Sequence, residues 1–524
     1  MEILQFNRMR VAFSAVAFSM MLAAPAAVTA QDAPASHMVV NLDTPGPVIN
    51  RHIYGHFAEH LGHGIYGGFW VEDGAGGWRL NKPVVEALRK IKPANVRWPG
   101  GCFADVYHWK DGVGPRAERP TIVNTLWGGV TENNSFGTHE FMELVTALDS
   151  EPIVVGNVGS GTVKEMSDWW EYLNHPGPSP MADLRAKNGR AEPWNVRFFG
   201  VGNESWGCGG NMDAEYYADV YKRFATYLHR YGDLQPFRVA TGPYHSEEMM
   251  KWTEVMMRDA GHMIDGLDLH YYTVVGTWQE KGSAVDFEEA DWIQGIRKGL
   301  VIDEAIKAQA AIMDRYDPEK RVWLIVGEWG MWHDVEPGTN PGFLRQQSTL
   351  RDAMVAALSL NAFNRHADRV KMANIAQTVN VLQAMILTQG DELIVTPTYH
   401  VFEMFKGHQD ATLLPVVLDE GAYNYGETTI PALNASASIN DEGRVLVTIA
   451  NFDPHSGRTV EVSLRGGTLS QVSGRILTAD AMTAHNTFDD PDNVAPAPFG
   501  GASLMDDHLV VKLPPKALVA LELE

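Results

Sequence analysis

The sequence predicts an α/β protein, a parallel (β/α)8 or TIM barrel followed by a β-sandwich of the jelly-roll type. Two patterns lead to this prediction. Between about residues 53 and 396, short apolar runs alternate with longer amphipathic stretches, and after residue 397 the helical periodicity fades into short alternating strands. Strands that are apolar on both faces and separated by helices are typical of a parallel sheet covered by helices. The chain has 524 residues, which leaves room for both parts.

The expected barrel strands are the apolar runs Ile53–Phe57, Asn95–Trp98, Pro152–Gly156, Val196–Val201, Phe237–Ala240, Gly266–His270, Val322–Val326 and Val370–Ile375. Helices are expected between them at Val84–Ile91, Glu140–Leu148, Ala214–Tyr231, Met249–Ala260, Glu304–Tyr316 and Gln346–Asn364. An open, doubly wound sheet would show a similar alternation. We favour the barrel because polar and aromatic residues follow the strand ends throughout, and because no glycine-rich phosphate loop opens a helix.

The expected sandwich covers residues 397–524. Its strands are Ser436–Ile439, Arg444–Ala450, Thr459–Ser463, Val472–Thr478, Leu509–Leu513 and Ala517–Leu523. Turn-forming segments at 440–443 and 489–493 separate some of these strands. Short alternating strands punctuated by turns favour a β-sandwich over further α/β units.

Charge and cysteine content exclude several classes of protein. The chain has 42 Lys and Arg against 65 Asp and Glu, which gives a net charge of −23. Such an acidic surface repels phosphate backbones and anionic lipid, so we expect a neutral ligand and neither a nucleic-acid nor a membrane partner. The two cysteines, Cys102 and Cys208, exclude a four-cysteine zinc or iron–sulfur site but allow one disulfide. We expect no metal site.

The first 30 residues have the pattern of a secretory signal peptide. Arg8 and Arg10 precede an apolar run from Val11 to Leu22, and the small side chains of Val28 and Ala30 suit cleavage after Ala30. The alternative is a membrane anchor, but the apolar run is too short to span a bilayer comfortably. The sequence therefore predicts an exported protein, periplasmic or secreted.

Two of the predicted barrel strands end in a glutamate beside tryptophans. Asn203 and Glu204 follow the run from Phe198 to Gly202, and Glu328 follows the run from Trp323 to Gly327. At the carboxyl ends of barrel strands, both glutamates would point into the barrel mouth, where catalytic groups lie. Glycoside hydrolysis needs two carboxyl groups that flank one bond. The alternative is that each glutamate forms an ordinary ion pair, but the pair of glutamates favours a glycosidase.

Several motifs occur along the chain in a defined order. They are Ile53–Gly62 (IYGHFAEHLG), Arg97–Gly101 (RWPGG), Trp109–Pro115 (WKDGVGP), Glu171–Pro176 (EYLNHP), Gly202–Glu204 (GNE), Gly327–Trp329 (GEW), Arg365–Lys371 (RHADRVK) and Ala376–Val381 (AQTVNV). This ordered set resembles the α-L-arabinofuranosidases of glycoside hydrolase family 51. The resemblance implies a retaining, exo-acting enzyme without a cofactor, which releases terminal arabinofuranose from arabinan, arabinoxylan or their oligosaccharides. It also implies that residues 31–52 add a strand to the sandwich, that residues 53–396 form the catalytic barrel, and that a homo-oligomer is possible.

The resemblance also implies roles for individual residues. Glu204 matches the acid/base, Glu328 matches the nucleophile, and Asn203 matches the residue that binds the sugar 2-hydroxyl. The other sugar-binding positions that it implies are Glu59, Arg97, Tyr272, Trp332 and Gln377. Arg97 could also keep Glu328 ionised, because an opposite charge favours the charged form of a carboxyl group.

Two structural alternatives stay open among these positions. Arg97 and Glu59 could simply pair with each other. Gln377 could be a buried strand residue whose amide is satisfied by the backbone.

Cys102 departs from the family pattern, because many relatives have an asparagine directly after Pro-Gly-Gly. The sugar contact at this position is therefore lost or replaced. Cys208 lies four residues after Glu204, and the loops that carry the two cysteines are expected to open on the same face of the barrel. We expect a Cys102–Cys208 disulfide, with two buried free thiols as the alternative.

Two other functions stay open. Another furanosidase or an endo-acting glycanase on the same scaffold would use the same chemistry, the endo enzyme in an open cleft rather than a blind pocket. A non-catalytic carbohydrate-binding protein would hold glycans through its tryptophans and its sandwich. The presence of both Glu204 and Glu328 speaks against the binding protein.

Overall fold

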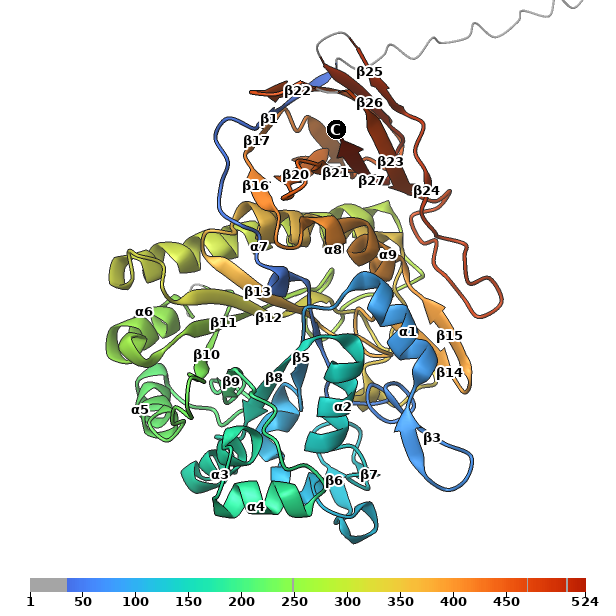
Figure 1. Ribbon diagram of the computed structural model, residues 1–524. Helices are drawn as coiled ribbons and strands as arrows, with labels where there is room; N and C mark the ends of the chain where they lie inside the picture. The colour runs from blue at the N-terminus through green and yellow to red at the C-terminus, as the bar shows by residue number, and fades with distance from the viewer. Residues whose placement is uncertain (1–34, 247–248, 469, 506–507) are drawn as a thin grey trace, which may run out of the picture. The chain divides into compact units, whose positions relative to one another are not determined.

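The computed structural model describes residues 35–524, except 247–248, 469 and 506–507. The expected signal peptide at residues 1–30 lies outside the described residues. Within the part of the chain that is described, no helix is long and apolar enough to cross a membrane. The described chain contains a closed α/β barrel and a domain of two β-sheets (Figure 1).

Eight parallel strands close the barrel, so the predicted (β/α)8 fold is confirmed. In order around the barrel they are β2 (Gly55–Phe57), β5 (Asn95–Trp98), β8 (Glu151–Gly156), β9 (Phe198–Val201), β10 (Phe237–Tyr244), β11 (Gly266–Thr273), β12 (Trp323–Met331) and β13 (Val370–Ile375). Each of these strands overlaps one expected apolar run. Strands β10, β11 and β12 continue several residues beyond the runs, and these extensions carry much of the barrel mouth.

The described helices surround the barrel. They are α1 (Lys82–Ile91), α2 (Thr138–Leu148), α3 (Val163–Asn174), α4 (Pro180–Lys187), α5 (Ala214–Ala225), α6 (Met250–Asp259), α7 (Glu289–Tyr316), α8 (Leu350–Arg365) and α9 (Pro397–Phe405). No individual range was predicted for α3, α4 or α9. Helix α7 begins at Glu289 rather than Glu304, and α5 ends at Ala225 rather than Tyr231. Three hairpins extend from the barrel: β3 (Trp70–Glu72) with β4 (Trp78–Leu80), β6 (Ile122–Asn124) with β7 (Val130–Glu132), and β14 (Ile386–Gln389) with β15 (Glu392–Val395).

An apolar layer fills the barrel near the starts of its strands. It contains Ile153, Phe198, Val239, Ile325 and Met372, which come from five different strands and are almost fully buried. Alternate residues of a barrel strand point inward, so the next inward layer lies closer to the carboxyl ends of the strands. Polar side chains occupy that second layer. The apolar layer lies between them and the amino-terminal ends of the strands, and it separates them from water at that end of the barrel.

The β domain is a sandwich of two sheets. One sheet has the order β17 (Val416–Leu418), β1 (Ser36–Asn41), β22 (Arg458–Arg465), β26 (Leu509–Leu513) and β25 (Ala502–Leu504). The other has the order β16 (Thr412–Leu414), β20 (Leu433–Ile439), β21 (Val445–Asn451), β27 (Ala517–Leu523), β23 (Val472–Leu477) and β24 (Ala497–Pro498). A separate hairpin joins β18 (Ala422–Tyr425) to β19 (Thr428–Pro431). Strand β1, from the N-terminal side of the barrel, runs parallel to β22 and antiparallel to β17.

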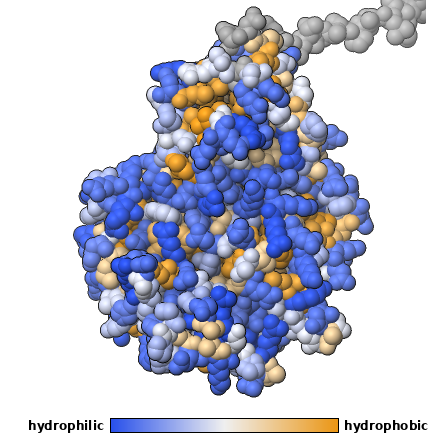
Figure 2. All heavy atoms as spheres, viewed as in Figure 1, coloured by the Kyte–Doolittle hydropathy of each residue, from blue (hydrophilic) through white to orange (hydrophobic). Residues whose placement is uncertain are grey.

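Strands β20 and β21 are buried on both faces because they lie between the sandwich core and helix α8. In β21, Val445, Val447 and Ile449 point into the sandwich core, whereas Leu446 and Ala450 pack with the barrel core. Figure 1 shows α7, α8 and α9 on the side of the barrel next to these strands. The face of the molecule drawn in Figure 2 is mostly hydrophilic, in agreement with the acidic composition.

Candidate active site

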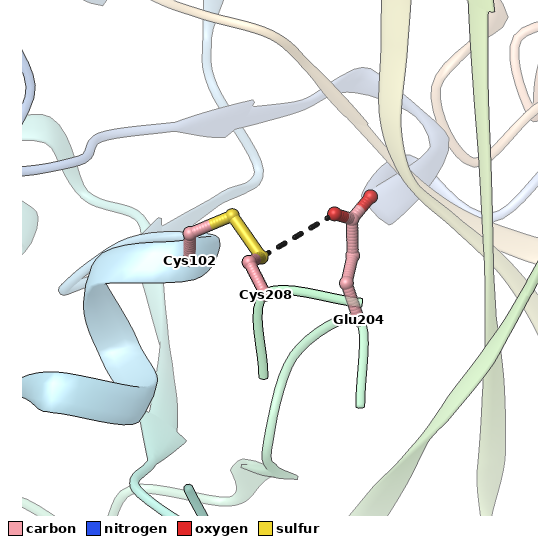
Figure 3. A group of neighbouring side chains, drawn as sticks. All are labelled: Cys102, Glu204 and Cys208. Carbon is pink, nitrogen blue, oxygen red and sulfur yellow. Dashed lines mark hydrogen bonds between the residues drawn. A yellow bond between two sulfur atoms is a disulfide. The ribbon is translucent and has the colours of Figure 1, made fainter. Parts of the chain in front are cut away.

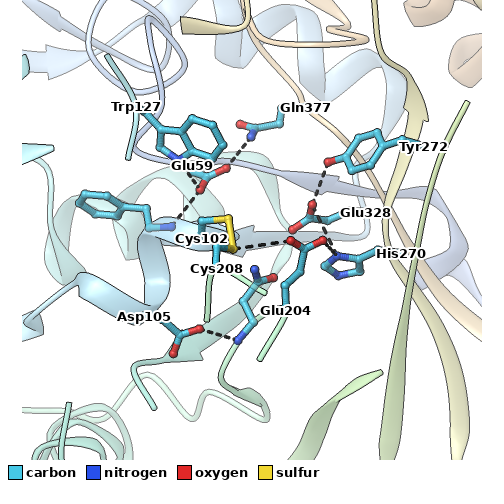
Figure 4. The surroundings of a disulfide bond; sticks show 12 residues. Glu59, Cys102, Asp105, Trp127, Glu204, Cys208, His270, Tyr272, Glu328 and Gln377 are labelled. Atoms are coloured by element: carbon cyan, nitrogen blue, oxygen red, sulfur yellow. Dashed lines mark hydrogen bonds and ion pairs between the residues drawn. A yellow bond between two sulfur atoms is a disulfide. The ribbon is translucent and has the colours of Figure 1, made fainter. Parts of the chain in front are cut away.

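Glu204 and Glu328 meet at the carboxyl ends of the barrel strands. Glu204 follows β9 after Gly202 and Asn203, and Glu328 lies in the extended part of β12. A carboxylate oxygen of each glutamate and a ring nitrogen of His270 all lie within 4.8 Å of one another. The two strand-end glutamates that the sequence singled out are therefore brought together (Figure 4).

Both oxygens of Glu328 accept hydrogen bonds. Arg97 Nη1 donates to Oε1 at 2.8 Å, and Tyr272 Oη donates to Oε2 at 2.8 Å. Arg97 also donates to Oδ1 of Asn203, so it joins Glu328 to the residue before Glu204. Arg97 thus pairs with Glu328 rather than with Glu59. A Cβ on Gly101 would come within 2.6 Å of Glu328 Oε1, so a larger residue there would displace the Glu328 carboxylate.

Glu204 has a less polar environment. Its Oε1 lies 2.9 Å from His270 Nδ1, and its Oε2 lies 3.6 Å from the sulfur of Cys208 (Figure 3). Because this sulfur is in a disulfide and carries no hydrogen, the second contact is a van der Waals contact when Glu204 is ionised. Burial raises the pKa of Glu204, and the charge of Glu328 adds to the increase, whereas the hydrogen bond from His270 opposes it. The environment therefore favours the protonated form of Glu204.

His270 lies between the two glutamates and was not expected from the sequence. Besides its contact with Glu204, Nδ1 lies 3.6 Å from Glu328 Oε2, and Nε2 lies 3.2 Å from Asp268 Oδ2. Burial alone would lower the pKa of His270, but the charges of Glu328 and Asp268 raise it to about 10. Asp268 also accepts a hydrogen bond from the backbone N–H of Gly327 at 2.7 Å, which ties β11 to β12 next to Glu328.

Glu59 forms a second buried cluster with Gln377. Glu59 Oε1 accepts hydrogen bonds from Trp127 Nε1 at 3.0 Å and from the Phe103 backbone at 3.2 Å. Its Oε2 accepts from Gln377 Nε2 at 2.8 Å, so Gln377 is bound by a side chain rather than by the backbone alone. Burial, followed by the charge of Glu328, raises the pKa of Glu59 to about 7.

Two buried polar atoms of the site have no hydrogen-bond partner among the described residues. They are Nδ2 of Asn203 and Oε1 of Gln377. Buried polar atoms are nearly always hydrogen-bonded, and an unpaired one costs roughly 1–3 kcal/mol. A donor and an acceptor are thus available for a polar ligand.

Asp105 holds the loops of the barrel mouth in place. Its Oδ2 accepts a hydrogen bond from the backbone N–H of Asn203 at 2.8 Å, and its Oδ1 accepts from Val158 at 2.7 Å and from Gly159 at 2.9 Å. Asp105 follows β5, Val158 and Gly159 follow β8, and Asn203 follows β9, so these hydrogen bonds join the loops after three barrel strands. Asp105 was not expected from the sequence, because its partners are backbone groups distant in sequence.

A disulfide joins Cys102 to Cys208, with Cα atoms 5.5 Å apart and a sequence separation of 106. Cys102 begins the short 3-10 helix Cys102–Val106 after β5, and Cys208 lies in the loop after β9. Figure 4 shows the bond between the Glu59 cluster and the Glu204–His270 pair. The loop that carries Glu204 is therefore covalently tied to the neighbouring loop.

A cavity of about 930 Å³ opens next to Glu204 and His270. Most of its wall comes from the loops after β9, β10, β11 and β12. Its aromatic lining residues are Trp206, Tyr244, Tyr271, Tyr272, Trp278 and Trp332. The rings pack against one another in pairs: 4.7 Å separates the centroids of Trp206 and Tyr244, and 5.5 Å those of Trp278 and Trp332. Aromatic faces of this kind are suited to stacking on sugar rings.

Among the described residues of this site, two groups have atoms close enough to hold a metal ion: Glu204, His270 and Glu328, and Cys102, Glu204 and Cys208, whose two sulfurs are bonded to each other in the disulfide. The atoms of the first group already have partners, because Arg97 and Tyr272 donate to Glu328 and both ring nitrogens of His270 face carboxylates. The arrangement is that of an acid–base cluster with paired charges.

Two models of protein families match the chain. One, described as the alpha-L-arabinofuranosidase 1 domain, matches residues 87–289, and the other, the alpha-L-arabinofuranosidase C-terminal domain, matches residues 327–517. A protein of Bacteroides ovatus named intracellular exo-alpha-L-arabinofuranosidase is 47% identical over 509 residues, 96% of this chain and 98% of that protein. The chain belongs to the α-L-arabinofuranosidase family.

Solved structures agree with this assignment. The crystal structure of a family 51 arabinofuranosidase from Xanthomonas axonopodis pv. citri is 48% identical, with a TM-score of 0.91 over 93% of this chain and 100% of that chain. An α-L-arabinofuranosidase from Thermotoga maritima, solved as an arabinose complex, is 29% identical, with a TM-score of 0.82 over 93% and 99% of the two chains. The resemblance to glycoside hydrolase family 51 is confirmed, and this member of the family is a glycoside hydrolase.

The prediction of a periplasmic or secreted protein is contradicted. The relative from Bacteroides ovatus is named intracellular, and so is one from Streptomyces lividans that is 29% identical over 493 residues, 89% of this chain and 72% of that protein. The prediction rested on the basic and apolar pattern of residues 1–30 alone. Such a pattern is a matter of composition alone.

Proposed function

We propose that this protein is a retaining, exo-acting α-L-arabinofuranosidase that releases terminal arabinofuranose from arabinan, arabinoxylan or their oligosaccharides. The observation that carries the proposal is the approach of Glu204 and Glu328 to within 4.8 Å. Retaining glycosidases hold their two carboxyl groups about 5 Å apart, whereas inverting enzymes leave roughly 6.5–9.5 Å for a water molecule. The names of the relatives support the substrate.

In this proposal Glu328 is the nucleophile and Glu204 is the acid/base. Glu328 attacks the anomeric carbon while Glu204 gives its proton to the leaving oxygen, and the glycosidic bond breaks. In the second step Glu204 takes a proton from water, the water oxygen bonds to the anomeric carbon, and the bond to Glu328 breaks. The hydrogen bonds from Arg97 and Tyr272 suit a charged Glu328, and the raised pKa of Glu204 suits a proton donor.

The arabinofuranosyl ring would bind between Arg97, Asn203, Glu59 and Gln377. Nδ2 of Asn203 and Oε1 of Gln377, which have no partner in the part of the chain that the structure describes, would bond to its hydroxyl groups. We assign Cys102 to the same subsite as an apolar contact through the disulfide. Tyr272 and Trp332, whose ring centroids lie 5.0 Å apart, would form the wall where the ring meets the leaving group.

The proposal also covers the organisation of the chain. We assign catalysis to residues 53–396 and treat residues 31–52 and 397–524 as a structural companion. From the family resemblance we include a homo-oligomer, which light scattering on the purified protein tests directly.

The deciding experiment measures turnover of 4-nitrophenyl α-L-arabinofuranoside beside other aryl furanosides and pyranosides. We expect turnover of the arabinofuranoside, no turnover by Glu328→Ala, and a slow Glu204→Ala enzyme that azide reactivates. Azide would attack the glycosyl-enzyme from the side that water uses, so the product is the α-azide if the mechanism is retaining. Glu319→Ala, at an exposed position, is the control. A wild-type enzyme that is inactive on every arabinofuranoside would refute the proposal, and a β-azide would refute retention.

A further inference from the structure

His270 occupies a position that connects the two carboxyl groups of the site. It is 4% exposed and lies on β11, between the loop that carries Glu204 and the strand that carries Glu328. One ring nitrogen, Nδ1, approaches both carboxyl groups, at 2.9 Å from Glu204 Oε1 and 3.6 Å from Glu328 Oε2. The proposed two-step reaction gives this side chain no role.

Both ring nitrogens of His270 face only hydrogen-bond acceptors. Nδ1 faces the oxygens of Glu204 and Glu328, and Nε2 faces Asp268 Oδ2 at 3.2 Å. A neutral imidazole has one N–H and one lone pair, so one of its nitrogens would direct a lone pair at a carboxyl oxygen, unless the proton of Glu204 sat on Oε1 rather than on Oε2, from which it is transferred. The imidazolium form has an N–H on each nitrogen and satisfies both sides. The geometry therefore selects the charged form.

The neighbouring charges balance when His270 is an imidazolium and Glu204 is protonated. Arg97 and His270 then carry two positive charges, against the two negative charges of Glu328 and Asp268. Arg97 lies 2.8 Å from Glu328 and 4.0 Å from Asp268, so each cation is close to both anions. Tyr272 remains a neutral donor to Glu328, and burial keeps its pKa well above the usual value. The proton on Glu204 is then free for transfer from Oε2.

We propose that His270, held as an imidazolium by Asp268, is a positioning residue that shares its Nδ1–H between Glu204 and Glu328 and stabilises whichever of them is charged. This proposal rests on the function proposed above. In the first step Glu328 becomes an ester and loses its negative charge, while Glu204 gives up its proton and gains one. In the second step the charge returns. The imidazolium is within hydrogen-bonding or close electrostatic distance of both positions, so it need not move as the charge moves.

Two substitutions of His270 separate the charge from the hydrogen bond. In His270→Asn the side-chain amide places a neutral donor near the position of Nδ1, and in His270→Gln it places one near the position of Nε2. Both remove the positive charge, which lowers the pKa of Glu204 in the native enzyme. We therefore expect the alkaline limb of the kcat/KM profile, which reports loss of the Glu204 proton, to move up by about 1 pH unit in both variants. We expect kcat to fall about 10- to 100-fold.

Asp268→Asn provides a test that leaves His270 in place. In this variant the amide oxygen at position 268 can still accept the N–H of Gly327. The NH₂ group then faces Nε2 of His270, which can accept a hydrogen bond from it and needs no proton of its own. We expect an alkaline shift in the same direction as in His270→Asn but smaller, because the negative charge of Asp268 is lost together with the positive charge of His270. The double variant should match Asp268→Asn, because both then lack the imidazolium and the Asp268 charge. His262→Asn, at an exposed histidine before the same strand, is the control and keeps the wild-type profile.

The wild-type protein gives an independent measurement. With ¹⁵N-labelled histidine, both ring nitrogens of His270 should have protonated chemical shifts at pH 7, and the signal is assigned by its absence in either variant. Neutral-imidazole shifts would overturn the proposal, and so would a His270→Asn enzyme whose alkaline limb stays at the wild-type pH. A uniform loss of rate without a moved limb would also overturn it. An inactive wild-type enzyme would refute the proposed function. The NMR measurement needs no substrate, so it tests the charge of His270 separately.

Discussion

Glu59 is a buried carboxyl group whose protonation links the site to the stability of the fold. It is 2% exposed, and its pKa is raised to about 7 by burial and by the charge of Glu328. In the unfolded chain a glutamate titrates near 4.5. Between these two values the folded protein keeps a proton that the unfolded chain releases. The contribution of Glu59 to stability is therefore present below about pH 4.5 and is lost as the pH rises to about 7.

Glu59→Gln should remove this pH dependence. The difference in unfolding free energy between variant and wild type should move in favour of the variant by up to about 3 kcal/mol between pH 4.5 and pH 8. Glutamine fits, because the amide of Gln377 can rotate and present its unpaired Oε1 to the new NH₂ group. Urea unfolding at a series of pH values measures the difference, with Glu319→Gln as an exposed control. A difference that stays constant with pH would contradict the raised pKa.

Residues at strand ends could be predicted from the sequence, whereas those bound through the fold could not. Glu204 and Glu328 each follow an apolar run, and that pattern marks the mouth of a barrel. Asp268 and His270 are two positions apart on β11, so their side chains share one face, but only the neighbouring strands show what that face meets. Neither Asp268 nor His270 was predicted from the sequence to belong to the site. Trp127 likewise reaches Glu59 from a distant loop.

At the scale of elements, α7 illustrates how packing overrides local propensity. Its first half contains Gly295 and Gly299, and glycine disfavours a helix. The helix was therefore expected to begin at Glu304, fifteen residues after its observed start at Glu289. The glycines lie four residues apart and face α8. A Cβ on Gly295 would lie 3.2 Å from Arg351, and one on Gly299 would lie 3.2 Å from Val355. They allow close approach of the two helices, a tertiary effect that no local pattern reveals.

The barrel strands were predictable for the opposite reason. Their side chains are buried on both faces of the sheet, so each strand appears in the sequence as a short run of apolar residues. The exact bounds of β5 and β13 match the expected runs, whereas β11 and β12 continue past them. The continuations contain polar residues such as Tyr272 and Glu328, which serve the site and interrupt the apolar pattern.

A buried asparagine, Asn361, joins α8 to strands β20 and β21. Asn361 Nδ2 donates to Asn434 Oδ1 at 2.9 Å, and its Oδ1 accepts from Ser436 and from Thr448, both at 2.8 Å. Asn361→Ala would leave three buried groups without this partner, so we expect a loss of roughly 2–4 kcal/mol in unfolding free energy. Ser359→Ala on the same helix is the control, because Ser359 bonds only to the backbone of its own helix. Equal urea midpoints for the two variants would contradict this account.

The loop after β11 supplies an outer wall of the cavity through Trp278. This ring is 56% exposed and lies at right angles to Trp332. If it stacks on a sugar unit of the leaving group, Trp278→Ala should raise KM for arabino-oligosaccharides about 2- to 10-fold. It should leave the hydrolysis of 4-nitrophenyl α-L-arabinofuranoside nearly unchanged. Tyr227→Ala, which removes a similarly exposed ring at a distance from the cavity, is the control. An unchanged KM for oligosaccharides of every length would refute the role of this wall.

At the scale of the whole molecule, the sandwich unites both ends of the described chain. Strand β1 at Ser36–Asn41 pairs with β22 at Arg458–Arg465, and β27 at Ala517–Leu523 lies in the centre of the other sheet. The barrel is contained in the sequence between them. Pairings between residues so far apart cost loop entropy before they stabilise the fold, so the sandwich sheet that contains β1 cannot be completed before the strands after the barrel exist.

The disulfide between Cys102 and Cys208 acts on the unfolded chain as a whole. It closes a loop with a sequence separation of 106 residues, and cross-linking a loop of this size removes unfolded-state entropy worth roughly 4–5 kcal/mol. The double variant Cys102→Ala/Cys208→Ala should therefore unfold at a lower urea concentration than the wild type. A reductant should lower the wild-type midpoint in the same direction and leave the double variant unchanged. The number of free thiols in denatured, unreduced protein should be zero. Two reactive thiols per chain, or a midpoint that neither reduction nor substitution lowers, would show that the bond does not stabilise this fold.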